Sequence, residues 1–513
     1  MRYSTVLAKL AFAISLLYSP ASFAGPPETV STDAPSQTVA LHAALQAAVA
    51  KTDSGAYADA EALAKSVVAN PFFKNLAVED RHLAYYTLGK AELNADDAEA
   101  ALPNLKLATE FPIAQEDDWS LRLSAAYENG DYDDSAGSLT IIARKWPQSL
   151  SDFKDSAIFK LGQQAFDTSD DSAISLLESL HAAKWRPSDK FRIPDELWVM
   201  LARVYLRKGD VAKAVSALND VEDAGQMVTI HSELVFDAVV ALNPAHFDVP
   251  LALADEVAAS GQLSAAYPDS LEGIVSRADV LIKANRAEDA LPLLDAAIKR
   301  ATPADGSPSP FADTDDELNW AYNDRARALH LLGRYDEELD AYKMGAHQKE
   351  IGKTNVSQVI NLGGAFVSLR RPGDALQTIA DFDPVAATSP YGRIALAETE
   401  ACAYSQQNDS ANLSKELDYM KAHSADGWLM LLDAFICADD RDDAAKLLIA
   451  QLQNPKTRSG AIYRLQDFIL PQNATPFEKT CTSALLSIRD RPDVAAAISA
   501  VGRIGSYPLV PDY

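Results

Sequence analysis

A spacing of large, small and turn residues recurs along this chain, and it restricts the possible folds more than any other feature. Its best copy is Trp198, Leu201, Ala202, Tyr205, Gly209, Ala214 and Leu218. Residues three and four apart lie on one side of a helix, a glycine ends the helix, and a small alanine lets a second helix approach closely. The spacing therefore predicts pairs of antiparallel helices joined by a tight turn. We name the first helix of each pair the A helix and the second the B helix.

Imperfect copies of this pair lie on both sides of the best one. Turns between A and B helices are expected near Gly55, Asp96, Gly130, Ser169, Gly209, Asn285, Gly333, Arg370, Asn408 and Asp439. The pattern resembles the tetratricopeptide repeat (TPR), and the chain is similar to an exported, bacterial-type member with degenerate repeats. The resemblance implies an all-α fold, an α-solenoid of stacked TPR-like helix pairs in which each pair contacts its neighbours.

Residues 1–24 have the pattern of a secretory signal peptide. Two basic residues precede a short apolar stretch, and Ser22-Phe23-Ala24 suits a small-residue cleavage site. We therefore expect a mature chain that starts at Gly25 and is periplasmic or secreted. No later stretch is long and apolar enough to predict a transmembrane helix.

Composition suggests how the remaining residues are organised. Pro303, Pro308 and Pro310 prevent a regular helix and suggest a break between two arrays. We expect a flexible lead-in at 25–38, an N-terminal TPR-like array at 39–300, a linker at 301–316, a C-terminal TPR-like array at 317–456 and capping helices at 457–513.

The charge excludes one class of function. The chain has 73 acidic against 46 basic residues and a formal net charge of -27. Nucleic-acid binding by phosphate neutralisation requires the opposite balance. A nucleic-acid partner is therefore not expected.

The three cysteines, Cys402, Cys437 and Cys481, allow at most one disulfide. Counted from the expected turns, Cys402 and Cys437 lie on neighbouring A helices with an offset of four residues, which is about 6 Å along a helix. Added to a helix separation of roughly 8 to 10 Å, this offset exceeds the Cα separation that a disulfide tolerates, about 7 Å. The sequence therefore predicts three free thiols.

No catalytic motif is present. The sequence lacks GxSxG and HExxH, and no two histidines stand four apart as ligands on one helix face. The acidic run 313–317 precedes an expected helix, where carboxylates stabilise the N-terminal dipole, so we interpret it as a cap and not as a calcium site. No catalytic residue, metal or cofactor is predicted.

The resemblance implies that a partner binds on the side of the A helices that faces away from the B helices. In the best repeat this face carries Arg203 and Arg207, and a later repeat adds Trp320, Asn323, Arg327 and His330. Asn323 and Arg327 weakly resemble the polar clamp with which some family members hold a peptide carboxylate. The next repeat offers only Ile360 and Gly364 at the matching positions, which puts a C-terminal peptide ligand in doubt.

A second candidate is the loop 184–192, which gathers basic and aromatic residues in an acidic chain. Its candidate contact residues are Trp185, Arg186 and Phe191.

Three functions stay open at this point. The first is an exported, non-catalytic scaffold that binds a protein or peptide partner in the cell envelope. The second is an accessory factor in envelope polysaccharide synthesis or export, for which the loop 184–192 would contact saccharide. The third is an enzyme on an α-solenoid or α-toroid, which would need carboxylates that converge in a closed groove.

Overall fold

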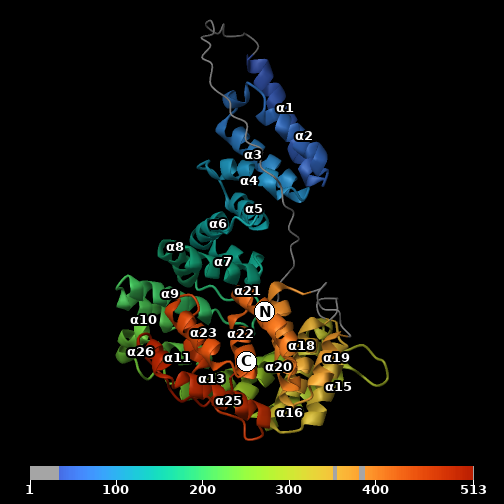
Figure 1. Cartoon of the computed structure of the whole chain (residues 1–513). Helices are drawn as coiled ribbons and strands as arrows, with labels where there is room; N and C mark the ends of the chain where they lie inside the picture. The colour runs from blue at the N-terminus through green and yellow to red at the C-terminus, as the bar shows by residue number, and fades with distance from the viewer. Residues whose placement is uncertain (1–33, 350–354, 381–387, 512–513) are drawn as a thin grey trace. The chain divides into compact units, whose positions relative to one another are not determined.

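The computed structural model describes residues 34–349, 355–380 and 388–511, and within them the protein is helical (Figure 1). The signal peptide at 1–24 and most of the lead-in lie outside the described residues. The described chain forms two compact units that divide between Lys208 and Gly209. We name residues 34–208 the N-terminal unit and residues 209–511 the C-terminal unit.

The N-terminal unit has five A helices and the B helices between them. Its helices are α1 (Ala34–Asp53), α2 (Tyr57–Val68), α3 (Val78–Asn94), α4 (Ala98–Thr109), α5 (Glu116–Glu128), α6 (Tyr132–Lys145), α7 (Asp155–Thr168), α8 (Asp170–Ala182) and α9 (Asp195–Arg207), with short 3-10 helices at Phe73–Asn75 and Pro147–Asp152. The principal contacts of each helix are with helices one or two places away along the chain. The unit is therefore a solenoid that does not close on itself.

The C-terminal unit continues the same alternation. It contains α10 (Val211–Leu218), α11 (Ala224–Ser232), α12 (Asp237–Leu242), α13 (Val249–Ala266), α14 (Leu271–Lys283), α15 (Ala287–Ala301), α16 (Thr314–Leu331), α17 (Tyr335–Ala346), α18 (Val356–Ser368), α19 (Pro372–Ala380), α20 (Pro390–Gln407), α21 (Ser410–Ala422), α22 (Trp428–Cys437), α23 (Arg441–Gln453), α24 (Arg458–Arg464), α25 (Pro476–Arg489) and α26 (Pro492–Ser499). Two 3-10 helices lie at Leu234–Phe236 and Ser424–Asp426. Both units thus consist of the expected TPR-like helix pairs.

The inter-helix turns lie where the sequence predicts them. Every predicted turn residue except Ser169 has a positive φ angle, between 54° at Asp439 and 78° at Gly209. In most of these turns the next residue donates its backbone N–H to the carbonyl five places earlier, as Asp131 does to Ala126. This is the Schellman ending, which satisfies the last carbonyls of the A helix. Ser169 is extended and instead caps α8.

Among the nine predicted turns with positive φ, the next residue is aspartate in five, arginine in three and Ala56 in one. Where it is aspartate, its carboxylate caps the B helix, as Asp97 does by accepting a hydrogen bond from the Ala100 N–H at 3.0 Å. Three turns have arginine instead, and the guanidinium binds an acid three residues later, as in Arg371 with Asp374. Both arrangements place a carboxylate at the positive end of the B helix.

The glycine of a Leu-Gly pair shows how closely the helices pack. A Cβ atom on Gly89 would lie 2.6 Å from the Leu105 side chain and 3.3 Å from the Ala101 carbonyl oxygen. Only glycine lets α3 and α4 approach to this distance.

The proline-rich segment between α15 and α16 is anchored to the array. Phe311 is buried, and Asp313 caps α14 by accepting hydrogen bonds from the Leu271 and Glu272 N–H groups, both at 3.0 Å. The helices on its two sides, α15 and α16, pack against each other. The sequence boundary between the two compact units of the described chain falls between residues 208 and 209, outside this segment.

The C-terminal unit closes on itself. The helix α24 packs on α11, and the extended residues after α26 return to the start of the unit. There the Arg503 N–H donates to the Ser232 carbonyl at 2.8 Å, and the Val510 N–H donates to the Lys283 carbonyl at 2.9 Å. The residues expected to cap one end of the array therefore also join its two ends.

Two expectations are wrong. The first helix already begins at Ala34, inside the expected lead-in at 25–38, because Pro35 lies in its first turn, where no intrahelical N–H bond is lost. Cys402 and Cys437 form a disulfide with a Cα separation of 5.1 Å, so they are not free thiols. The Ser405 hydroxyl donates to the Cys437 carbonyl at 2.7 Å, which shows that the end of α22 lies beside Ser405. The two A helices are displaced along their axes, and this displacement cancels the four-residue offset.

Candidate functional site

The A helices of the C-terminal unit carry a buried polar network. Arg327 of α16 donates to Asp279 of α14 at 2.6 Å and to Asp324 at 3.0 Å. Asn323 accepts hydrogen bonds from Gln358 at 3.3 Å and Asn361 at 2.7 Å, both on α18. Asn323 and Arg327 thus do lie on one face, but their polar groups bind neighbouring helices and not an open groove.

Gln358 and Asn361 were missed at the sequence level. The repeat spacing predicts that Ile360 of α18 lies opposite Asn323. In the structure Gln358 and Asn361, on either side of Ile360 in the sequence, contact Asn323 instead. The sequence feature that indicates this contact is a pair of amide side chains three residues apart, a spacing that places both on one face of a helix.

Burial controls the electrostatics of this network. Burial raises the pKa of Asp324 to about 7, although Arg327 acts in the opposite direction. A neutral Asp324 can keep its hydrogen bonds without placing a full charge in the interior. The network is therefore suited to holding three A helices in register.

His330, one turn further along α16, binds two carboxylates. Its Nδ1 lies 3.1 Å from Glu338 of α17, and its Nε2 lies 3.0 Å from Glu478 of α25. Burial alone would lower the pKa of His330, but the two carboxylates raise it to about 10. Burial would raise the pKa of Glu478. The charged His330, together with hydrogen bonds from the Thr475 N–H and the Ser368 hydroxyl, lowers it to about 2. Both groups are therefore charged at neutral pH.

The chain itself covers this side of α16 and α18. We name residues 471–489 the returning segment. Its Glu478 accepts from Ser368 at 2.8 Å, its Thr475 hydroxyl lies 3.1 Å from the Ser368 hydroxyl, and its Asn473 side chain donates to the Leu331 carbonyl at 2.9 Å. The A-helix face near His330 is thus occupied by the protein's own residues.

The predicted site residues of the N-terminal unit are also engaged. Arg203 is buried. Arg207 forms an ion pair with Asp170 at 2.5 Å, and its guanidinium lies 5.1 Å from the centre of the Phe166 ring. Trp320, in the C-terminal unit, is half-buried on α16.

The aromatic side chains of loop 184–192 mainly form packing contacts. Trp185 is 5% exposed and contacts Phe159 edge to face, with ring centres 5.4 Å apart. Phe191 is half-buried, whereas Arg186 is exposed. Because the Trp185 ring is enclosed, it offers no open face on which a saccharide could stack.

A row of contacts between successive A helices runs along the N-terminal unit. His42 of α1 bonds Asp80 of α3 at 3.0 Å, and His82 of α3 bonds Asp118 of α5 at 2.7 Å. Lys160 of α7 lies over the Tyr127 ring of α5 at 5.2 Å. We name the surface that continues this row the A-helix face of the N-terminal unit, defined by His42, Asp80, Tyr86, Lys90, Ser124, Tyr127, Lys160 and Phe166.

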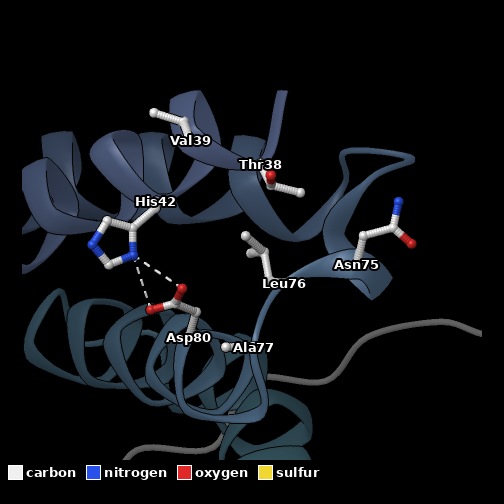
Figure 2. A pocket seen from close by; sticks show the side chains of 7 residues that line it. All are labelled: Thr38, Val39, His42, Asn75, Leu76, Ala77 and Asp80. Atoms are coloured by element: carbon white, nitrogen blue, oxygen red, sulfur yellow. Dashed lines mark hydrogen bonds and ion pairs between the residues drawn. The ribbon is translucent and has the colours of Figure 1, made fainter. Parts of the chain in front are cut away.

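At its first repeat this face has a shallow depression of about 310 Å³ (Figure 2). Thr38, Val39 and His42 of α1 line one side, and Asn75, Leu76, Ala77 and Asp80 line the other. Val39 is 69% exposed. The depression thus combines exposed apolar surface with the His42–Asp80 bond.

Two further features are absent from the described residues. Within these ranges, no three histidine, cysteine, aspartate or glutamate side chains are grouped to bind a metal ion. Nor does any helix in the described part of the chain have the length and apolarity needed to cross a membrane.

No protein-family model and no curated protein sequence matches this chain. Several solved structures align with it. The Cut9–Hcn1 hetero-tetramer of APC/C gives 13% identity and a TM-score of 0.28 over 89% of each chain. The P58(IPK) TPR domain gives 14% and 0.21 over 81% of this chain and 99% of its own, and yeast Tom70 gives 12% and 0.24 over 91% and 99%. Because TM-scores this low carry no argument, the assignment of a TPR-like solenoid rests on the helix pairs themselves.

Proposed function

We propose that this protein is an exported, non-catalytic scaffold, and that its N-terminal unit binds a protein or peptide partner in the cell envelope. One observation carries the proposal. The A-helix face of the C-terminal unit near His330 is covered by the returning segment, whereas the N-terminal unit is an open solenoid whose A-helix face has exposed and half-buried side chains. A solenoid offers an extended surface of this kind to a partner.

Two features support export. Residues 1–24 have the composition of a signal peptide. The Cys402–Cys437 disulfide is expected to persist in an oxidising compartment and to be rare in a reducing one. The partner is therefore proposed to lie in the periplasm or outside the cell.

The partner site can be tested by site-specific photocrosslinking. A photoreactive amino acid replaces Ser124, which lies on α5 within the A-helix face. The matched control replaces Ser66, an exposed serine on the B helix α2. Irradiation of the native envelope, followed by mass spectrometry, should give one predominant adduct from position 124 and none from position 66. Equal adducts from both positions, or none from either, would contradict the proposal.

A further inference from the structure

Two lysines on the A-helix face of the N-terminal unit lie against tyrosines instead of carboxylates. The Lys90 ammonium is 5.5 Å from the centre of the Tyr86 ring and 3.5 Å from its hydroxyl. The Lys160 ammonium is 4.1 Å from the centre of the Tyr132 ring and donates to its hydroxyl at 2.6 Å. Neither lysine has a carboxylate within ion-pair distance among the residues that the structure describes.

Three other cations of the N-terminal unit are held by carboxylates instead. Lys106 pairs with Asp131 at 3.2 Å, Lys208 pairs with Asp171 at 2.7 Å, and Arg207 is held by Asp170. Two acids, Asp117 and Asp118, act electrostatically on Tyr86, and of these Asp118 binds His82. A carboxylate that approaches Lys90 or Lys160 therefore displaces no existing ion pair.

Each lysine and its tyrosine form a pair of hydrogen-bond donors. The ammonium has three N–H groups, of which the tyrosine hydroxyl uses one. The phenolic O–H remains available to donate, since the oxygen acts as the acceptor towards lysine. One carboxylate can thus accept from an ammonium N–H and a phenol O–H together, which is the stronger, charge-assisted kind of hydrogen bond.

The charge around the two lysines is uneven along the sequence. Residues 144–208 contain eleven lysines and arginines against nine aspartates and glutamates, in a chain whose formal net charge is -27. This stretch has a net charge of +2 and includes Lys160. Residues 34–143, which include Tyr86, Lys90 and Tyr132, contain seven lysines and arginines against seventeen aspartates and glutamates. Charge therefore attracts an acidic segment at Lys160, whereas at Lys90 the attraction is confined to the ammonium group itself.

We propose that the A-helix face of the N-terminal unit captures an extended peptide segment of a partner protein through two of its carboxylates, one at Tyr86/Lys90 and one at Tyr132/Lys160. This inference rests on the proposed function and names its partner class. The two sites are two A helices apart, roughly 20 Å at about 10 Å per packed helix. An extended chain covers this distance in about six residues at ~3.3 Å each.

The spacing defines a probe. A fluorescein-labelled, 14-residue peptide of glycine, serine and alanine carries glutamate at positions 4 and 10, and a twin peptide carries glutamine there. Fluorescence anisotropy with the full mature protein should show the glutamate peptide binding about tenfold more tightly at low salt, since two exposed ion pairs contribute about that much. The variant Lys90→Gln/Lys160→Gln should lose this preference. The control Lys106→Gln/Lys208→Gln makes the same change in net charge at lysines already paired, and it should keep the preference.

Equal affinity for the two peptides, or a preference that survives in Lys90→Gln/Lys160→Gln, would overturn the inference. If either of these peptide results is obtained while position 124 still crosslinks a partner, the proposed function stands and only the carboxylate recognition fails. If position 124 also gives no adduct, both fail. An oligogalacturonate that displaces the probe more strongly than unlabelled glutamate peptide does would assign the two sites to an acidic saccharide and would contradict a peptide partner.

Discussion

The replacement of His330 by glutamine tests how the returning segment is held. His330 joins α16 to Glu478 of α25 and to Glu338 of α17, at 3.0 and 3.1 Å. The imidazole is 19% exposed, so the ion pairs are largely shielded from water. Glutamine keeps a hydrogen-bond donor at this position but removes the positive charge and the titration.

The expected cost follows from the pKa of His330. Its pKa is about 10 in the folded protein against an ordinary value of 6.5, a difference of 10 - 6.5 = 3.5. At about 1.4 kcal/mol per pKa unit, the charged imidazole stabilises the fold by at most ~5 kcal/mol. Removal of one partner of a buried ion pair typically costs about 3 to 5 kcal/mol, which agrees. We expect a loss of about 3 kcal/mol for His330→Gln at pH 6.

The sign of the pH dependence is also fixed. Because the folded pKa is raised, this stabilisation is complete below about pH 6.5 and disappears as the pH rises to about 10. The wild-type protein should therefore lose up to about 1.4 kcal/mol per pH unit between pH 7 and 9 from this group. The variant should lack this component, so the difference between the two proteins should shrink with rising pH.

Hydrogen exchange read by mass spectrometry can follow this effect in α25 itself. Protection of residues 476–489 should fall about tenfold per pH unit in the wild type, after correction for the intrinsic exchange rate, and should change little in His330→Gln. The same pH dependence in both proteins would refute the assignment of the stabilisation to His330.

Three further predictions concern other parts of the fold. Alkylation under denaturing, non-reducing conditions should label Cys481 alone, and labelling of three cysteines would contradict the Cys402–Cys437 disulfide. Gly502→Ala should lower the stability of the C-terminal unit by about 1 to 3 kcal/mol, because its Cβ would lie 2.5 Å from the Ser232 carbonyl oxygen. The control Gly373→Ala, whose Cβ meets no atom within 4 Å, should be nearly neutral. Equal melting temperatures for the two variants would argue against the closure. Asp97→Ala should cost about 1 kcal/mol in urea denaturation because it removes the cap of α4, and an unchanged midpoint would show that the cap contributes nothing.

The helix pairs and their turns could be predicted because their signals are local. A glycine, asparagine or aspartate suited to positive φ, followed by an aspartate that caps the next helix, marks five of the ten predicted turns within two residues of sequence. The spacing of Trp198, Leu201 and Tyr205 fixes which side of α9 is buried in the same way.

The closure of the C-terminal unit could not be predicted, because it depends on contacts between distant segments. Arg503 meets Asp237, and Glu478 meets His330, yet nothing near either pair in sequence marks the encounter. For the same reason Asn323, Arg327 and His330 were expected at an open surface. The disulfide was missed because positions along neighbouring A helices were compared as though their turns were level.

The central structural claim is that the chain itself covers the A-helix face of the C-terminal unit near His330. The proposal of a partner site on the N-terminal unit depends on this claim. Engineered disulfide formation tests this most directly. The Ser368 and Thr475 hydroxyls are 3.1 Å apart, so Ser368→Cys/Thr475→Cys, in a Cys481→Ser background, should bridge spontaneously during export. In the control Ser368→Cys/Ser487→Cys, the second cysteine lies twelve residues after position 475, which is about 18 Å further along α25. Peptide mapping without reductant should find the 368–475 bridge in most molecules and no 368–487 bridge. Free thiols at 368 and 475 in the folded protein would show that the returning segment does not occupy this face.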